Sequence, residues 1–386
     1  MKIILVSKNT NNFVSWTEKL KDSGHDLYWF DILDSGYSQK LGWVNQKFGW
    51  KQKFPNLKGR YFVKKNLPFI YNLIKPILER NLNKEFESFI QEVNPDLVHS
   101  FELQNSCIPI LSTMNRNRKL QWICSSWGKD LFNYKDSPNY RKQIQRIFTR
   151  LNYLITDCQR DIELAKNFGF KNKLLGSFPR GGGIDNDKYR NFINKPASER
   201  RTILVNGIQG KFGNSIAVIK ALEQLSKELK NYKVIVFNAD KRVLKYCNKV
   251  KIENILNISI YSNSKLLPHE EIMRLLGESL IYINNYSLGG LPSTLLESIS
   301  MGAFPIHSNP GGVAEEVITN NENGLLIKSC EDFEEIKGLI QKGLASSKLI
   351  EKAFIINQME IKSNYEREKI KQRVLTMYKR ASNNMS

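Results

Sequence analysis

The sequence predicts an α/β fold of two doubly wound, Rossmann-like domains with parallel sheets. Short β-branched segments alternate with segments of helical spacing along most of the chain, a pattern typical of parallel sheets covered on both faces. The length of 386 residues fits two domains better than one. A stretch rich in Gly, Asn and charge, at residues 180–201, divides the two halves.

The elements follow in order. The first half contains predicted strands at residues 2–7, 25–32, 97–101, 121–126 and 153–157. Its predicted helices lie at residues 14–20, 84–93 and 161–168. The second half contains predicted strands at residues 202–205, 233–237, 257–261, 280–284 and 304–307. Its predicted helices lie at residues 216–229, 270–276, 293–300 and 333–342.

These elements predict a first domain at residues 1–190 and a second at residues 191–348. The charged tail, residues 349–386, has a helical pattern and could cross back over the first domain. Ligands of open parallel sheets bind beyond the carboxyl ends of the strands. We therefore expect two sheets that face each other across a cleft, with the site in that cleft.

Composition indicates a cytoplasmic protein. The hydrophobic share is 41% and no run approaches the ~20 apolar residues of a membrane-spanning helix. The apolar run at the N-terminus is too short for a secretion signal. The five cysteines are scattered and form no CxxC pair, which predicts reduced thiols and neither a disulfide framework nor a zinc site.

The formal charge of +20 is concentrated in residues 40–75, which contain no acidic residue. Lys51, Lys53, Lys64 and Lys65 lie there among aromatic side chains. This mixture suits an anionic membrane surface or a lipid-linked acceptor, and it also fits a solvated basic face. Phosphate contacts and base stacking would suit nucleic acid as well, but no nucleic-acid-binding motif supports that partner.

The segment "LGGLPSTLLESISMGAFPIHSNPGGVAEEV", residues 288–317, carries the candidate chemistry. Gly289 and Gly290 follow a predicted strand, and Pro292 with Ser293 opens a helix. The free N–H groups at such a helix start can hold a phosphate. The carboxylate of Glu297, one turn further on, can accept hydrogen bonds from sugar hydroxyls. A second glycine pair, Gly311 and Gly312, follows the next strand and offers another close backbone approach.

This segment resembles the signature of the retaining nucleotide-sugar glycosyltransferases of family 4, which have the GT-B fold. That signature combines E-G-x-x-x-x-x-x-E with later G-G-x-x-E and N-G-x-L elements. The chain matches it at Gly290, Glu297, Gly302, Pro305, Ser308, Gly311, Gly312, Glu315, Asn323, Gly324 and Leu326. The segments "HSFELQ" and "SSWGKDLF" in the first half resemble a bacterial cell-surface subgroup of the family.

The resemblance implies residue roles. Glu297 holds the donor ribose, and backbone groups of the glycine loop contact the sugar and the distal phosphate. The implied donor residues are Gly207, Tyr286, Ser287, Gly289, Gly290, Leu291, Pro292, Ser293, Glu297, Gly311 and Gly312. In the first domain His99 lies at the end of a strand and faces the donor sugar, while Trp127 and Asp130 approach the sugar and the acceptor. A buried strand histidine and a helix cap are the structural alternatives for His99 and Asp130.

The chain departs from the family at two charged positions. The first acid of the signature falls on Gly289. The phosphate loop G-R-L-x-x-x-K-G becomes "NGIQGKFGN", so that Gly207 replaces the arginine and Lys211 lies beside the lysine position. Lys211 is then the candidate catalytic lysine. The "DND" at residues 185–187 is better interpreted as a loop or cap than as a metal site.

The resulting hypothesis is a metal-independent retaining hexosyltransferase without a cofactor. It uses a nucleotide-sugar donor, with a UDP-sugar favoured, and a lipid-linked or saccharide acceptor of bacterial surface glycan synthesis. The enzyme would be peripheral at the inner face of the cell membrane. Two alternatives stay open: a catalytically silent homologue that binds nucleotide-sugar or a partner transferase, and an epimerase or hydrolase on the same fold.

Overall fold

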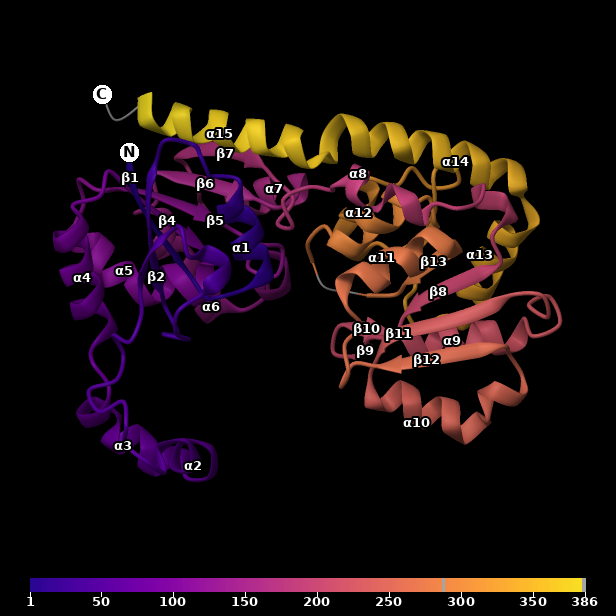
Figure 1. The fold of residues 1–386 in the computed structure, drawn as a ribbon, viewed down its shortest axis with the longest axis horizontal. Helices are drawn as coiled ribbons and strands as arrows, with labels where there is room; N and C mark the ends of the chain where they lie inside the picture. Colours follow the sequence, from indigo (N-terminus) through magenta and orange to yellow (C-terminus); the bar gives the residue numbers. More distant parts are fainter. Residues whose placement is uncertain (287–288, 384–386) are drawn as a thin grey trace. The chain divides into compact units, whose positions relative to one another are not determined.

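The computed structural model describes residues 1–286 and 289–383, and the chain forms two compact units (Figure 1). Unit 1 contains residues 1–157, residues 161–182 and the segment from Lys371 on. Unit 2 contains residues 158–160 and 183–370. Each unit is built on a parallel sheet, which confirms the predicted fold class. Ser287, an expected donor contact, lies outside the described residues.

Unit 1 has a seven-stranded parallel sheet in the order β3-β2-β1-β4-β5-β6-β7 within the described residues. The strands are β1 (Lys2–Ser7), β2 (Asp26–Asp31), β3 (Asn45–Lys47), β4 (Leu97–Phe101), β5 (Gln121–Ser125), β6 (Tyr153–Thr156) and β7 (Lys173–Ser177). The helices are α1 (Asn11–Glu18), α2 (Arg60–Asn66), α3 (Pro68–Leu78), α4 (Leu82–Val93), α5 (Ile108–Arg116), α6 (Pro138–Phe148) and α7 (Gln159–Asn167).

The core of unit 1 follows the two-residue period of its strands. Ile4 and Val6 of β1 belong to one core with Phe86 and Phe89 of α4. Helix α15 (Arg367–Asn383) contributes Tyr378, whose hydroxyl accepts a hydrogen bond from Trp16 Nε1 at 3.3 Å. The end of the chain is therefore part of the packing of unit 1.

Unit 2 has a six-stranded parallel sheet, ordered β12-β11-β8-β13-β14-β15, among the residues described. The strands are β8 (Thr202–Asn206), β11 (Lys233–Ala239), β12 (Ile258–Ser262), β13 (Ser279–Asn284), β14 (Phe304–Ser308) and β15 (Leu325–Ile327), with a small antiparallel hairpin of β9 (Gln209–Gly210) and β10 (Gly213–Asn214). The helices are α8 (Asn186–Tyr189), α9 (Ser215–Gln224), α10 (Lys241–Val250), α11 (His269–Glu278), α12 (Ser293–Ser300), α13 (Phe333–Ala345) and α14 (Ser347–Glu360).

Both faces of the second sheet are covered. Ile203 and Val205 of β8 lie in one core with residues of α9, α10 and α13. Leu204 of the same strand lies in another core with Met273 and Leu276 of α11. Two-sided burial explains why β8 has the continuous apolar run that predicted it.

The segment that contains α2 and α3 lies away from the sheet of unit 1 (Figure 1, indigo to violet). Its two ends pair with each other through the antiparallel bridge Gln52↔Glu79 and the hydrogen bond from Arg80 N to the carbonyl of Lys51 at 2.8 Å, and Lys51 N donates to Asp34 Oδ2 at 2.9 Å in the loop after β2. Within the described part of the chain, no helix is long and apolar enough to cross a membrane.

Candidate active site

A chain of hydrogen bonds joins the carboxyl ends of four neighbouring strands of unit 2. Asn238 Nδ2 donates to Asn206 Oδ1 at 3.4 Å, and Asn206 Nδ2 donates to Asn284 Oδ1 at 3.1 Å. Asn284 Nδ2 donates to His307 Nε2 at 2.7 Å, and His307 Nδ1 donates to the carbonyl of Ser308 at 2.6 Å. Burial lowers the pKa of His307 to about 4, which keeps the ring neutral and fits this pattern. Neutral groups therefore fix this edge of the sheet.

The glycine loop leads from β13 into α12. The Tyr286 N–H donates to Ser308 Oγ at 2.8 Å, and the Ser308 hydroxyl donates back to the Tyr286 carbonyl at 2.7 Å. Gly290 has a φ of 137°, which residues with a side chain rarely adopt. Pro292 is the N-cap of α12, and no side chain of the described residues caps this helix. Its first N–H groups and its positive end can thus serve an anion.

Glu297 lies one turn into α12 and already has a partner that the sequence did not reveal. His269 Nε2 lies 2.9 Å from Glu297 Oε1, and His269 Nδ1 lies 3.3 Å from the hydroxyl of Tyr189. The hydrogen bond with Glu297 raises the pKa of His269, although burial opposes it. The Glu297 side chain is 13% exposed and that of His269 is 55% exposed. A ligand hydroxyl that binds Glu297 has to share the carboxylate with this histidine or displace it.

The β9–β10 hairpin occupies the expected phosphate loop. A Cβ atom on Gly207 would lie 2.6 Å from Ala239 Cα, so the backbone here excludes the arginine of the family signature. Lys211 is exposed in the turn, and its Nζ lies 5.2 Å from the ring centroid of Phe212. Arg242, paired with Asp240 at 2.8 Å, donates to the carbonyl of Gln209 on this hairpin. The hairpin therefore carries one exposed lysine and is held from α10 by Arg242, an arginine already paired with Asp240.

The second glycine pair follows β14. Gly311 and Gly312 have φ values of 64° and 82°, so both lie in the left-handed region. The carboxylate of Glu316 accepts the backbone N–H groups of Gln159 and Arg160, each at 2.8 Å, and thereby fixes the segment after this pair. The turn chemistry that the sequence indicated is confirmed, while a ligand contact stays a prediction.

In unit 1 the expectation for His99 needs a correction. His99 lies in the middle of β4, not at its end, and is fully buried. Its Nδ1 lies 2.5 Å from the Tyr378 hydroxyl and its Nε2 lies 2.9 Å from Ser125 Oγ. Burial lowers the pKa of His99 to about 3. Both ring nitrogens already have partners within unit 1. The geometry therefore supports the alternative given above, that His99 is a buried, hydrogen-bonded histidine of the strand.

The carboxyl edge of the unit 1 sheet instead carries a charged group that the sequence reasoning missed. Glu102 directly follows β4 with a φ of 71°, an uncommon backbone conformation for a residue other than glycine. Its carboxylate pairs with Lys8 at 3.0 Å and with Lys129 at 2.9 Å. Burial opposes its charge, but the ammonium groups of Lys129 and Lys8 outweigh it and lower the pKa of Glu102. The sequence did offer one signal for Glu102, because it directly follows a predicted strand, at the edge of the sheet where ligands bind.

Asp130 lies beside this charged group. Its Oδ2 accepts the N–H groups of Leu103 at 2.9 Å and of Trp127 at 3.1 Å. Its Oδ1 is buried without a hydrogen-bond partner among the described residues. Burial, together with the negative charge of Glu102, raises the pKa of Asp130 to about 7. Asp130 therefore ties two loops together, and Trp127 is 5% exposed in the same place.

The remaining candidates are dispersed. Lys51, Lys53, Lys64 and Lys65 belong to the segment around α2 and α3, where Lys53 Nζ donates to the carbonyl of Pro76 at 3.0 Å. Asp185 caps α8 by accepting the N–H of Lys188 at 3.2 Å, which confirms the interpretation of that acidic stretch as a cap.

Comparison with known proteins agrees with this geometry. Residues 185–358 match the family of glycosyl transferases group 1. An uncharacterized glycosyltransferase of Methanocaldococcus jannaschii is 32% identical over 125 residues, which cover 32% of this chain and 31% of that protein. The chain thus matches about a third of the length of this curated relative.

Solved structures match the whole chain. Sucrose-phosphate synthase from Thermosynechococcus elongatus has a TM-score of 0.70 and 12% identity, with 100% of both chains covered. HepE of Anabaena, solved with UDP and also with UDP-glucose, has a TM-score of 0.69 and 11% identity in the UDP complex, with 98% of this chain and 100% of that chain covered.

The two parallel-sheet units and these structural neighbours define the class: the chain has the GT-B fold. The match to the glycosyl transferases group 1 model, over residues 185–358, includes the glycine loop, α12 and both glycine pairs.

Proposed function

We propose that this chain is a retaining glycosyltransferase that moves a hexose-type sugar from a nucleotide-sugar, with a UDP-sugar favoured, to an acceptor hydroxyl. The proposal rests on three features that occur together in unit 2: the glycine loop, the N-terminus of α12 without a side-chain cap among the described residues, and Glu297 one turn into that helix. The group 1 domain spans these residues, and a structural neighbour has been solved with UDP.

In this proposal the distal phosphate of the donor binds the backbone N–H of Leu291, just before α12, and that of Ser293, the first residue of the helix. Glu297 accepts hydrogen bonds from the ribose hydroxyls, with His269 as a second contact. Lys211 turns from its exposed position to the diphosphate, since Gly207 leaves no side chain there. Tyr286 and the neighbouring glycines, which replace the missing acid at Gly289, contact the sugar.

The reaction breaks the bond between the anomeric carbon and the distal phosphate oxygen and forms a bond from that carbon to the acceptor oxygen. The leaving phosphate gains negative charge, which helix N–H groups and Lys211 stabilise in place of a metal ion. The acceptor hydroxyl loses its proton, and the leaving phosphate oxygen is the base nearest to it. Attack from the same face gives retention, as the family resemblance implies, and needs no protein nucleophile.

Unit 1 supplies the acceptor side of the proposal. The Lys8–Glu102–Lys129 group at the carboxyl edge of its sheet combines a carboxylate of lowered pKa with two ammonium groups, which suits hydroxyl and phosphate groups of an acceptor. Asp130 is a positioning residue, because its carboxylate holds the loops of Leu103 and Trp127. His99 and Tyr378 support this edge from within the core.

The acceptor in this proposal is a lipid-linked or saccharide intermediate of bacterial surface glycan synthesis, met at the inner face of the cell membrane. The acid-free basic segment, residues 40–75, supports an acceptor at an anionic surface. Nucleic acid is not proposed as a partner.

A second candidate is a catalytically silent homologue that binds nucleotide-sugar or a partner transferase. The two lost charges at Gly207 and Gly289 favour it. Both proposals predict donor binding, so turnover has to separate them.

The test incubates the purified chain with UDP-, GDP- and ADP-sugars and measures nucleoside diphosphate release with and without a bacterial lipid extract. Acceptor-dependent release from one donor supports the transferase. Release without any acceptor indicates a hydrolase. Donor binding without release, measured by thermal unfolding, leaves the silent homologue.

A further inference from the structure

The α2–α3 segment is the least buried helical part of unit 1. Helix α2 has no buried residue, and α3 has only Tyr71. Two backbone hydrogen bonds, Lys53 N to the Leu78 carbonyl at 3.0 Å and Arg80 N to the Lys51 carbonyl at 2.8 Å, pair the two ends of the segment, and Lys51 N donates to Asp34 Oδ2 at 2.9 Å in the loop after β2. It is therefore anchored at the base and open along its length.

The exposed surface of α3 is apolar. Phe69, Ile70, Leu73 and Ile77 are 76%, 46%, 65% and 65% exposed. Each residue turns an α-helix by ~100°, so these four side chains lie on one face of α3, within an arc of about 100° around the helix axis. Such a row of large apolar side chains is rare on a protein that stays in water.

Helix α2 extends this surface with two aromatic side chains, Tyr61 at 77% and Phe62 at 63% exposure. With the four residues of α3 they form what we name the apolar face. Aromatic side chains settle at the boundary between lipid headgroups and acyl chains.

The charges around the apolar face have one sign. No acidic residue occurs in residues 40–75. The basic side chains of α2 and α3 are Arg60, Lys64, Lys65 and Lys75. A soluble protein partner with a purely apolar surface would leave these basic side chains without negative charges to pair with. An anionic bilayer offers acyl chains for the apolar face and phosphates for the basic side chains.

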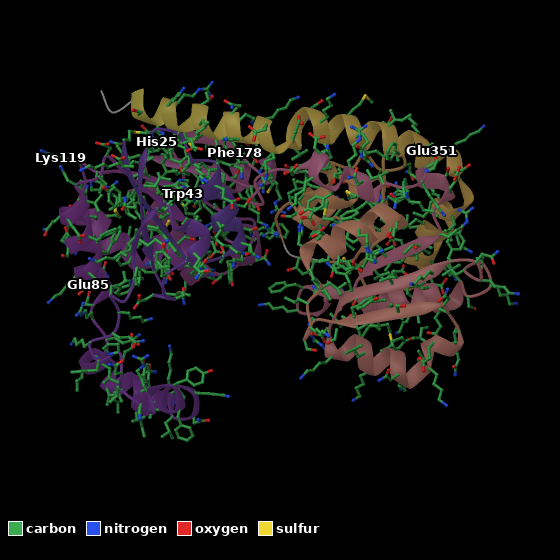
Figure 2. The ribbon with its side chains drawn as sticks, viewed as in Figure 1. His25, Trp43, Glu85, Lys119, Phe178 and Glu351 are labelled. Atoms are coloured by element: carbon green, nitrogen blue, oxygen red, sulfur yellow. The ribbon has the colours of Figure 1, made fainter. Side chains whose placement is uncertain are left out.

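A cavity of about 750 Å³ opens at the base of the same segment. Its wall includes Glu85 of α4, labelled in Figure 2, and the aromatic ring of Trp50. The basic residues that line it are Lys51, Lys53, Lys75, Arg80 and Lys84. Its second acid, Glu79, accepts the hydroxyl of Tyr71 at 2.5 Å. The cations outnumber the acids, so the cavity suits a phosphate group.

We infer that the α2–α3 segment is an interfacial anchor for an anionic phospholipid bilayer. The apolar face enters the boundary between headgroups and acyl chains, and the basic cavity at the base holds a lipid phosphate. The inference rests on the proposed function and deepens it by naming the helices and the cavity that hold the chain at the membrane where the acceptor is met. It is measured without donor or acceptor, so its failure and a failure of the transferase proposal are distinguishable.

The test is flotation of the full chain with vesicles of phosphatidylcholine alone or with phosphatidylglycerol added. We expect binding only to the anionic vesicles. Phe69→Ser with Leu73→Ser should lower the partition coefficient at least tenfold, because both lost side chains are in the apolar face. Lys51→Gln with Lys53→Gln should lower it about tenfold or more, since each lysine contributes on the order of a factor of five.

Matched controls come from unit 2. Leu266 is 71% exposed, and Leu266→Ser should leave binding unchanged. Lys227→Gln with Lys230→Gln removes two exposed lysines and should reduce binding less than the Lys51 and Lys53 pair does. Because the chain has six native tryptophans, the wild type is the reference for Phe69→Trp: the variant should show additional emission that brominated lipid quenches more than it quenches the wild type.

Further outcomes decide the inference. Inorganic phosphate at constant ionic strength should weaken vesicle binding of the wild type more than chloride does, if the cavity takes lipid phosphate. Equal flotation of wild type and the Phe69 and Leu73 variant overturns the inference. A concentration-dependent dimer without vesicles, abolished in that same variant, would also overturn it and make the apolar face a contact between two copies.

Discussion

The carboxyl edges of the two sheets use opposite electrostatics. In unit 2, the edge is fixed by neutral amides and a neutral histidine, His307, and the glycine loop leaves backbone N–H groups of α12 uncapped among the described residues. In unit 1, the edge holds Lys8, Glu102 and Lys129, which compensate one another, beside buried Asp130. At the first edge the helix N–H groups have no side-chain partner among the described residues, while at the second edge both ammonium groups already pair with Glu102. This difference is the reason why we propose the donor site in unit 2.

The largest expected effect tests the charged edge. Asp130→Asn keeps an acceptor for the loop N–H groups but removes the charge. The pKa of Asp130 is about 7 in the folded chain, against ~3.9 when unfolded, so burial of this group costs no stability below about pH 4, and the cost grows as pH rises from about 4 to 7 and is constant above that. Near pH 8 the variant should be more stable by on the order of 4 kcal/mol.

Urea unfolding of both proteins at pH 5 and pH 8, followed by tryptophan fluorescence, measures this difference. The exposed Asp136→Asn is the control and should not alter the pH dependence. Parallel pH profiles of the wild type and the Asp130 variant would show that this carboxylate is not strained by burial.

A second change tests how tightly the neutral edge is built. Gly207→Ala places a Cβ 2.6 Å from Ala239 Cα and should destabilise the chain by about 1–3 kcal/mol. Gly338→Ala in α13 meets no atom within 4 Å and should stabilise the chain by about 0.5–1 kcal/mol. Thermal unfolding midpoints that fall for the first and rise for the second fit the account; a neutral Gly207 variant would mean that the loop backbone adapts.

The third prediction concerns ligand affinity at the neutral edge. Glu297→Ala removes the carboxylate proposed for the ribose and should weaken UDP binding by about 1–3 kcal/mol, or roughly 5- to 150-fold. Isothermal titration measures it, with exposed Glu334→Ala of α13 as the control. Unchanged affinity in the Glu297 variant would remove this residue from the donor site.

The smallest effect comes from the pair of His269 and Glu297. The hydrogen bond with Glu297 raises the pKa of His269, so the protonated pair is present at low pH and is lost as pH rises through that pKa. Loss of the proton releases the Glu297 carboxylate for a ligand hydroxyl, so UDP affinity should increase with pH. The increase should be up to about fivefold, the size expected of a solvent-exposed ion pair. His269→Ala should flatten the profile between pH 5.5 and 8.5. A pH dependence that persists in this variant would have another source.

The sequence predicted the parts of the fold that have continuous apolar runs. The predicted strand at residues 97–101 matches β4, and the predicted helix at residues 293–300 matches α12. It did not reveal β3 (Asn45–Lys47) or β7 (Lys173–Ser177), because three polar residues and a strand interrupted by glycine carry no periodic signal. The tail was predicted as one helical stretch, but a π turn at residues 361–365 divides it into α14 and α15.

The site was predictable where spacing along the chain sets it. Gly290, Pro292 and Glu297 lie within eight residues, so their pattern alone indicated the start of α12. His269 is 28 residues before Glu297, and Tyr378 is 279 residues after His99. Contacts at such separations are created by packing. For that reason the partner of Glu297 was missed, and for His99 the sequence left a site role and a core role as alternatives.

The most direct measurement of the central claim is a crystal structure of the chain with UDP. The account predicts the diphosphate at the N-terminus of α12, within hydrogen-bond distance of the backbone N–H groups of Leu291 and Ser293. The ribose hydroxyls should lie on Glu297. Two results would contradict the proposed donor site at this edge of unit 2. One is UDP bound away from α12, and the other is a crystal soaked in excess UDP that contains none.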